Sequence, residues 1–141
     1  GDTEFAAWSM THIGGVSMED YCALCGDCED WNQQKRQIEE RVRKSAYHII
    51  DYKGATWFAV GLALTRIVDA ILRHTRSVLT VSIPLEGEFG VENVALSVPC
   101  LVSSKGVEKI IQGRLTEPEM DALKHSAATL RKAIGELESA G

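Results

Sequence analysis

The chain has 141 residues, of which 45% are apolar and 25% are charged, and its formal net charge at pH 7 is −5. This length is typical of one domain with a real hydrophobic core. The acidic balance argues against a dominant nucleic-acid or anionic-membrane surface, which needs clustered Lys and Arg, and the longest apolar run, residues 55–64, is too short for a bilayer span of about 20 residues.

The first 30 residues show little periodicity, and only residues 11–16 have the composition of a short strand. A helical pattern begins at about Trp31. Apolar residues then recur at steps of three and four, which places them on one stripe of a helix: Ile38, Val42, Ala46 and Ile49. Gly54 is typical of a helix end or a kink, so we predict a helix that runs from Trp31 to this glycine.

Residues 55–75 predict a second helix, which is apolar nearly all round and is therefore expected to be buried against several neighbours. The period then falls to two, and this alternation predicts three antiparallel strands, at residues 79–85, 94–102 and 107–111. Residues 103–106 predict a hairpin turn between the last two strands. Pro84 and Pro99 cannot donate a hydrogen bond to a neighbouring strand, so each predicts an edge position or a bulge.

The sequence ends in a long amphipathic helix. Thr116 and Glu119 form a capping box, and Pro118 lies in the first turn, a pattern typical of a helix start. Apolar residues follow at steps of three and four up to Leu137, which predicts a helix face lying on the sheet. Two helices, an antiparallel meander and a closing helix predict an α+β fold, with long helices packed on an antiparallel sheet, and one domain over residues 1–141.

Three of the four cysteines, Cys22, Cys25 and Cys28, follow one another at steps of three, and Cys100 lies far from them. Thiolates at this spacing bind zinc or an iron–sulfur cluster in some proteins. A structural site normally needs a fourth ligand, and no motif supplies one, so we predict no metal site and reduced thiols. Reduced thiols, together with an N-terminus unlike a signal peptide, predict a cytoplasmic protein.

Four groups of short segments stand out by their order and spacing: Gly1-Asp2-Thr3-Glu4-Phe5 with Trp8-Ser9, Lys53-Gly54-Ala55-Thr56, Ser97-Val98-Pro99-Cys100 with Gly106-Val107, and Leu115-Thr116 with Leu123-Lys124 and Ser126-Ala127. Together they resemble the C-terminal substrate domain of L-lactate dehydrogenases, in the lactate/malate dehydrogenase superfamily. In that family the first segment follows the catalytic histidine. The resemblance therefore implies a histidine immediately before Gly1.

The resemblance implies the interconversion of pyruvate and L-lactate by hydride transfer with NADH and NAD. This reaction needs a general acid for the ketone oxygen and cations for the carbonyl and the carboxylate. The histidine, aspartate and two arginines that supply them in the family are expected upstream, as is the Rossmann domain with its glycine-rich NAD motif, which these 141 residues lack. We therefore expect the 141 residues alone to be inactive. The whole enzyme is expected to be a bacterial, cytoplasmic homotetramer without nucleic-acid or membrane partners.

The resemblance also implies roles for five residues. Thr56 matches a position that lines the pocket and touches the ketoacid, and the alternative is a threonine that only caps the second helix. Val60 matches a position against the nicotinamide ring, where an apolar wall shields hydride transfer from water, and the alternative is a plain core valine. Ser45 and Ala46 match positions that border the substrate's tail, or they are small residues that allow close helix packing. Tyr47 matches a tyrosine recorded as a phosphorylation site in bacterial members.

Two alternatives remain open. One is a malate or other 2-hydroxyacid dehydrogenase of the same superfamily, because the loop that distinguishes the substrates is expected upstream. Glu4 and Thr56 favour lactate over malate. The other alternative is a non-catalytic metal-binding or assembly domain that uses the run of Cys22, Cys25 and Cys28.

Overall fold

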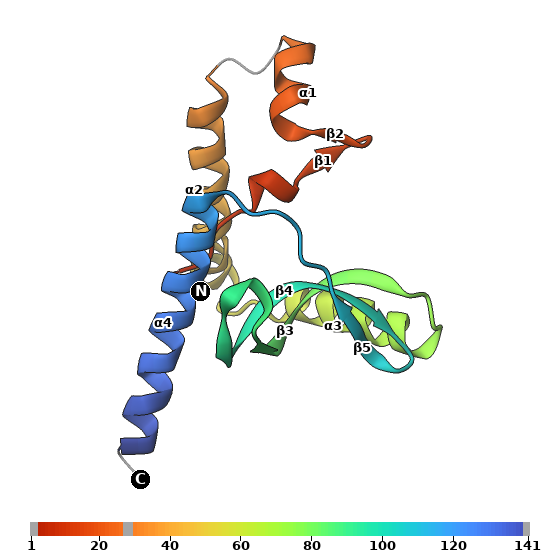
Figure 1. Ribbon diagram of the computed structural model, residues 1–141, viewed down its shortest axis with the longest axis vertical. Helices are drawn as coiled ribbons and strands as arrows, with labels where there is room; N and C mark the ends of the chain where they lie inside the picture. Colours follow the sequence, from red (N-terminus) through yellow and green to blue (C-terminus); the bar gives the residue numbers. More distant parts are fainter. Residues whose placement is uncertain (1–2, 27–29, 140–141) are drawn as a thin grey trace. The chain divides into compact units, whose positions relative to one another are not determined.

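The computed structural model of the chain describes residues 3–26 and 30–139 (Figure 1). The chain divides into two compact units: Gly1–Gly54 with Gly113–Ser126, and Ala55–Gln112 with Ala127–Gly141. Helix α4 (Glu117–Ser139) begins in the first unit and continues into the second. Among the described helices, none combines the length and the apolar composition that crossing a bilayer requires.

The first unit begins with a short hairpin. After a 3-10 turn, η1 (Trp8–Met10), the strands β1 (His12–Ile13) and β2 (Val16–Ser17) pair antiparallel. Gly14 and Gly15 connect them, both with positive φ, a conformation that glycine adopts without steric cost. The strand predicted over residues 11–16 is therefore two short strands joined by a tight turn.

Helix α1 (Met18–Cys25) is an element that the sequence pattern did not predict. The Ser17 hydroxyl accepts a hydrogen bond from the backbone N–H of Asp20 at 3.1 Å, which caps the first turn. Gly26 ends the helix in the left-handed conformation. The helix has only eight residues, too few for a helical spacing of apolar residues to stand out.

Helix α2 (Trp31–Lys53) confirms the predicted helix at both ends. At its start, the Asp30 side chain accepts a hydrogen bond from the backbone N–H of Gln33 at 3.1 Å. At its end, Gly54 is left-handed, and its N–H donates to the Ile50 carbonyl at 2.7 Å. The sequence predicted the start of this helix from its apolar period and its end from Gly54, whereas the Asp30 cap was not predicted.

The second unit contains a three-stranded antiparallel sheet in the order β3-β4-β5 (Figure 1). Its strands are β3 (Ser77–Glu86), β4 (Glu92–Ser103) and β5 (Gly106–Ile110), and a short turn, η2 (Glu88–Gly90), joins β3 to β4. The buried apolar residues of β4 alternate along the strand: Val94, Leu96, Val98, Cys100 and Val102. Helix α3 (Trp57–Leu72) packs on β4, so the α+β prediction is confirmed.

The two prolines occupy different kinds of strand. Pro84 lies in β3, an edge strand, as predicted. Pro99 lies in the middle strand β4, so an edge position is wrong for this residue, and the register shift of β4 against β5 lies between Leu101 and Val102 rather than at Pro99. However, the register of β4 with β5 begins only at Cys100, and the Pro99 carbonyl accepts a hydrogen bond from the N–H of Ile111 at 2.8 Å. Pro99 therefore lies where pairing with β5 stops.

Helix α3 exposes most of its apolar side chains. Within the described residues, its one buried residue is Ala70, whereas the larger side chains face solvent: Trp57, Phe58, Val60, Leu62, Leu64, Val68 and Leu72. The prediction of a helix buried against several neighbours is therefore wrong for the described part of the chain. The physical reason is that one sheet covers only one stripe of a helix.

The start of α4 confirms the half of the predicted capping box in which the Glu119 side chain binds Thr116. A carboxylate oxygen of Glu119 accepts hydrogen bonds from the backbone N–H and the hydroxyl of Thr116, at 2.8 and 2.9 Å. Further along the helix, Leu123 and Ala127 are buried. In the second unit, the Arg131 guanidinium donates to the Glu92 carbonyl at the start of β4, which ties this part of α4 to the sheet.

Candidate functional site

Thr56 takes the N-cap position of α3, but its side chain does not cap the helix. Its backbone angles are φ −101° and ψ 19°, the side chain makes no capping hydrogen bond, and the residue is half-buried. Its carbonyl accepts a long hydrogen bond of 3.4 Å from the N–H of Val60. The alternative role of Thr56 as a side-chain cap is therefore not realised, and the hydroxyl remains available for another partner.

Val60 follows one turn later on α3 and is 53% exposed. The alternative of a plain core valine is therefore not realised within the described residues, because a core side chain is almost fully buried. Thr56 and Val60 lie close together at the start of one helix. One offers a hydroxyl and the other an apolar surface.

Ser45, Ala46 and Tyr47 lie together in the middle of α2 and are exposed. The Ser45 hydroxyl donates to the Val42 carbonyl at 2.7 Å. Ser45 also lines a groove of about 430 Å³, together with Gln37, Glu40, Arg41, Lys44, His48 and Ile49. These three residues belong to the first unit, whereas Thr56 and Val60 belong to the second.

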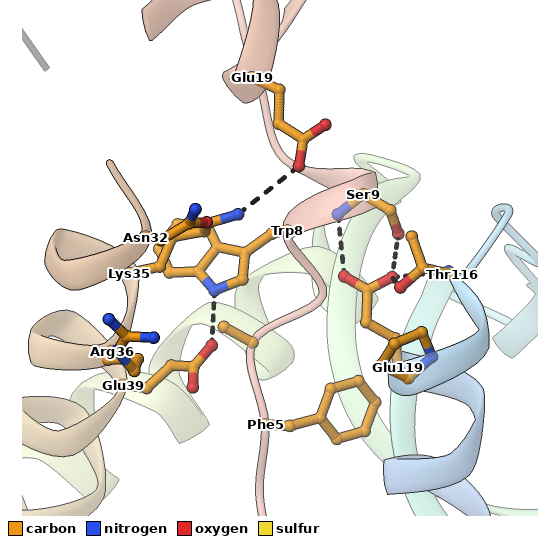
Figure 2. Close-up of a pocket in the computed structure, with 12 residues that line it drawn as sticks. Phe5, Trp8, Ser9, Glu19, Asn32, Lys35, Arg36, Glu39, Thr116 and Glu119 are labelled. Atoms are coloured by element: carbon orange, nitrogen blue, oxygen red, sulfur yellow. Dashed lines mark hydrogen bonds and ion pairs between the residues drawn. The ribbon is translucent and has the colours of Figure 1, made fainter. Parts of the chain in front are cut away.

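The first unit holds another cavity, of about 480 Å³, which the sequence did not predict (Figure 2). It is formed where the segment before β1 meets the start of α2 and the start of α4. Five charged side chains line it: Glu19, Lys35, Arg36, Glu39 and Glu119. Figure 2 shows that each of its three carboxylates contacts a neighbouring group. Glu39 accepts a hydrogen bond from Trp8, Glu119 accepts one from Ser9, and Glu19 pairs with Lys35, so these contacts hold the cavity lining together.

Trp8 is held on α2 by two contacts. Its indole N–H donates to the Glu39 carboxylate at 2.6 Å, and its ring meets that of Trp31 edge to face, with centroids 5.2 Å apart. Lys35 lies over the Trp31 ring at 5.6 Å and pairs with Glu19 at 3.5 Å. Because Trp8 and Glu39 are 31 residues apart, no local pattern indicated that they would pair.

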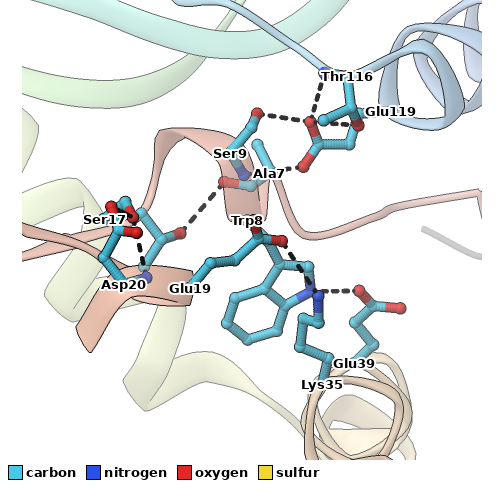
Figure 3. Close-up of polar contacts among 11 residues, drawn as sticks. Ala7, Trp8, Ser9, Ser17, Glu19, Asp20, Lys35, Glu39, Thr116 and Glu119 are labelled. Atoms are coloured by element: carbon cyan, nitrogen blue, oxygen red, sulfur yellow. Dashed lines mark hydrogen bonds and ion pairs between the residues drawn. The ribbon is translucent and has the colours of Figure 1, made fainter. Parts of the chain in front are cut away.

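Ser9 is held on the start of α4 by Glu119 (Figure 3). Its backbone N–H donates to one carboxylate oxygen of Glu119 at 3.0 Å, and its hydroxyl contacts the other oxygen. The hydroxyl also lies 2.9 Å from the Arg114 carbonyl. The same carboxylate thus caps α4 through Thr116 and binds a segment 110 residues earlier in the chain.

The environment of Glu119 favours its charged form. Burial alone raises the pKa of this carboxyl. Hydrogen bonds from Ser9 and Thr116 to the carboxylate outweigh that effect, and the pKa of Glu119 lies below its ordinary value. The negative charge is therefore part of what holds Ser9 in place.

The cysteine run gives no metal site within the described residues. Residues 3–26 and 30–139 contain no group of three or more His, Cys, Asp or Glu side chains placed to hold a metal ion. Cys25 and Cys100 are thiols outside any disulfide, as predicted, whereas Cys22 is disulfide-bonded, so the prediction of reduced thiols is wrong for that residue. Cys28 lies outside the described residues.

Comparisons with known proteins agree over nearly the whole chain. Residues 1–140 match the profile of the lactate/malate dehydrogenase α/β C-terminal domain. The L-lactate dehydrogenase of Treponema denticola is 52% identical over 139 residues, which cover 97% of this chain and 44% of that protein. The L-lactate dehydrogenase of Thermoanaerobacterium saccharolyticum is 47% identical over 138 residues, covering 98% of this chain and 44% of that protein.

A solved structure has the same fold. It is a lactate dehydrogenase from a Medee basin deep-sea metagenome library, 30% identical with a TM-score of 0.91, and the match covers 98% of this chain and 44% of that one. The chain therefore spans less than half the length of the proteins it matches.

Proposed function

We propose a function from one premise: this chain belongs to the lactate/malate dehydrogenase family, and its residues 1–140 match the α/β C-terminal domain of that family. The proposal is that residues 1–141 form the substrate domain of an NAD-dependent L-lactate dehydrogenase. The whole enzyme would transfer a hydride from NADH to C2 of pyruvate while a proton goes to the ketone oxygen, giving L-lactate and NAD. The 52% identity to a protein named L-lactate dehydrogenase carries the proposal.

In this proposal Thr56 lines the pocket for the substrate. A wall that discriminates among small ketoacids needs a side chain of limited volume, and a hydroxyl that is not consumed by the backbone can face a polar ligand. Thr56 meets both conditions, because it is half-buried and its side chain does not cap α3. Ser45 and Ala46 are proposed to border the methyl end of the substrate, and Tyr47, which is 58% exposed, is proposed as a modification site.

The residues present fit one side of a nicotinamide site. When bound, NADH supplies the hydride. Val60 is more than half exposed and lies on an apolar helix, so in this proposal it offers an apolar surface that a bound ring would cover. The 141 residues contain no glycine-rich phosphate-binding motif, so the proposal assigns the rest of the cofactor to the N-terminal part of the whole enzyme.

A chimaera tests the proposal. The part of the Treponema denticola enzyme that precedes the match is joined to these 141 residues, and NADH oxidation is measured with pyruvate and with oxaloacetate. We expect turnover with pyruvate at a kcat/KM at least about tenfold higher than with oxaloacetate. Because the loop that distinguishes the substrates comes from the Treponema denticola part, the chimaera tests whether these residues complete an active dehydrogenase, and a folded chimaera that oxidises NADH with neither substrate overturns the proposal. The 141 residues alone are expected to oxidise no NADH.

We further propose that the enzyme is a bacterial, cytoplasmic homo-oligomer, with a tetramer as the expected state. The matched relatives come from Treponema and Thermoanaerobacterium, and the apolar residues that α3 exposes would be unfavourable in free solution. Light scattering of the 141 residues is expected to show association that grows with concentration, and a strict monomer would contradict it. Stoichiometric zinc or iron in protein purified without chelators would instead support the metal-binding alternative.

A further inference from the structure

The segment that follows the expected catalytic histidine is bound to two helices by side chains from both. We call residues 3–11 the strap. The hydroxyls of Thr3 and Ser126 on α4 lie 3.0 Å apart, and Arg43 on α2 donates to the Glu4 carbonyl at 3.2 Å. Further along the strap, Trp8 is bound by α2 and Ser9 by α4, as described above. All these residues belong to the first compact unit.

Glu119 is the residue on which the strap depends most. It binds Ser9 through both carboxylate oxygens, once at the backbone and once at the hydroxyl, so it fixes the direction of the chain as well as its distance from α4. Its second set of hydrogen bonds, to Thr116, fixes the carboxylate in the first turn of α4. The first turn of α4 thereby holds a segment, residues 3–9, that belongs to no strand.

We propose that Glu119 is a positioning residue of the dehydrogenase reaction: by holding Ser9 on α4, it fixes from the downstream side the chain that carries the catalytic histidine. The inference rests on the proposed function, and on the expectation from the family resemblance that the catalytic histidine immediately precedes Gly1. Proton transfer to the ketone oxygen depends on the placement of the donor, and a displacement of about 1 Å can cost about a hundredfold in rate. Substrate binding depends on other groups, so the strap acts on kcat rather than on KM.

Two observations separate this role from that of an ordinary helix cap. Helix capping by Glu119 involves its bonds from Thr116, and the hydrogen bonds from Ser9 are no part of a capping box. In addition, the strap is also fixed on its α2 side, by Glu39 and Arg43. Two helices that hold one irregular segment from both sides form the kind of support that a precise catalytic position needs.

The test uses the chimaera described above, with Glu119→Gln, Ser9→Ala and the control Glu117→Gln. Glu117 is exposed on the same turn of α4 and has the same charge. For Glu119→Gln we expect kcat for pyruvate to fall about tenfold, KM to change less than about twofold, and the Ser9 amide to exchange its hydrogen about tenfold faster. Glu117→Gln should leave all three within about twofold of the parent.

Each outcome of this test either supports the proposal or overturns it. If Glu119→Gln melts below the assay temperature, Ser9→Ala replaces it, because this variant leaves the bonds between Thr116 and Glu119 intact. Ser9→Ala is expected to lower kcat by about threefold or more without changing KM. A kcat that stays within about twofold of the control in the folded variants overturns the proposal, as does an unchanged exchange rate of the Ser9 amide in Glu119→Gln. An unsubstituted chimaera that folds but does not reduce pyruvate overturns the proposed function, and this inference with it.

Discussion

The indole nitrogen of Trp8 donates a hydrogen bond of 2.6 Å to a carboxylate oxygen of Glu39. This bond joins the segment before β1 to the N-terminal half of α2. Both side chains are half-buried. A carboxylate that is partly removed from water needs its hydrogen-bond partner more than an exposed one does. The pair therefore contributes to stability as well as to the placement of the strap.

Replacing Trp8 with Phe removes the N–H and keeps an aromatic ring against Trp31. We expect Trp8→Phe to lower the free energy of unfolding by about 1–3 kcal/mol, because the Glu39 carboxylate loses its donor. The control is Trp57→Phe on α3, where the tryptophan is 80% exposed and the loss should stay below about 0.5 kcal/mol. Urea unfolding followed by circular dichroism measures both, and equal losses in the two variants would contradict the role of the Glu39 bond.

Glu119 makes the stability of the chain depend on pH in a definite direction. Its pKa is lowered in the folded state, so its contribution is fully present above its ordinary pKa of 4.5 and is lost as the pH falls through the folded value. Glutamine does not titrate. The stability difference between the parent and Glu119→Gln is therefore expected to be largest near neutral pH and to shrink below about pH 4.5.

Glu117→Gln is the control for this experiment, because Glu117 is exposed and lies in the same turn. Its stability difference from the parent should stay within about 0.5 kcal/mol at every pH. Guanidinium unfolding at several pH values gives both curves. A Glu119→Gln difference that is constant with pH, or that grows on acidification, would show that the carboxylate charge does not hold Ser9.

The sheet of the second unit is expected to be the most sensitive part of its core. Leu85 on β3 is 1% exposed, so Leu85→Ala leaves a cavity and should cost about 3 kcal/mol. Leu72, at the end of α3, is 79% exposed, and Leu72→Ala should change stability by less than about 0.5 kcal/mol at a protein concentration low enough for the 141 residues to be monomeric. Thermal unfolding of both variants tests this, and a cost for Leu72→Ala close to that for Leu85→Ala would mean that α3 is covered in solution.

The elements that the sequence predicted are those with local causes. Helix α2 has an apolar stripe of helical period and a left-handed glycine at its end, and β4 has a strict alternation of buried residues. These patterns lie within a few residues of one another, so they can be read from the chain. Helix α1 was missed because it has only eight residues and little amphipathic pattern.

The candidate site was predictable only in part, for the same reason. Thr56 and Val60 stand in a recognisable motif, and the structure adds that neither the capping role nor the core role accounts for them. The bonds from Ser9 to Glu119 and from Trp8 to Glu39 join residues 110 and 31 positions apart. No spacing rule connects residues so distant, because their contact depends on how the helices pack.

Thr56→Ala distinguishes the two roles of this threonine. Where an N-cap threonine caps its helix, replacement by alanine costs about 0.5–2 kcal/mol. Because the Thr56 side chain makes no capping hydrogen bond, we expect a loss below about 0.5 kcal/mol in the 141 residues. In the chimaera, the same change should lower kcat/KM for pyruvate relative to a ketoacid with a longer tail by about tenfold, because the pocket widens.

Thr65→Ala serves as the control on the same helix. Thr65 is exposed, and its hydroxyl donates to the Gly61 carbonyl at 2.8 Å, so its replacement should leave the selectivity of the chimaera unchanged. Unfolding curves and kcat/KM for both ketoacids are measured on each variant. A stability loss of about 1 kcal/mol or more for Thr56→Ala, with selectivity unchanged, would mean that Thr56 caps α3 in solution and does not line the pocket.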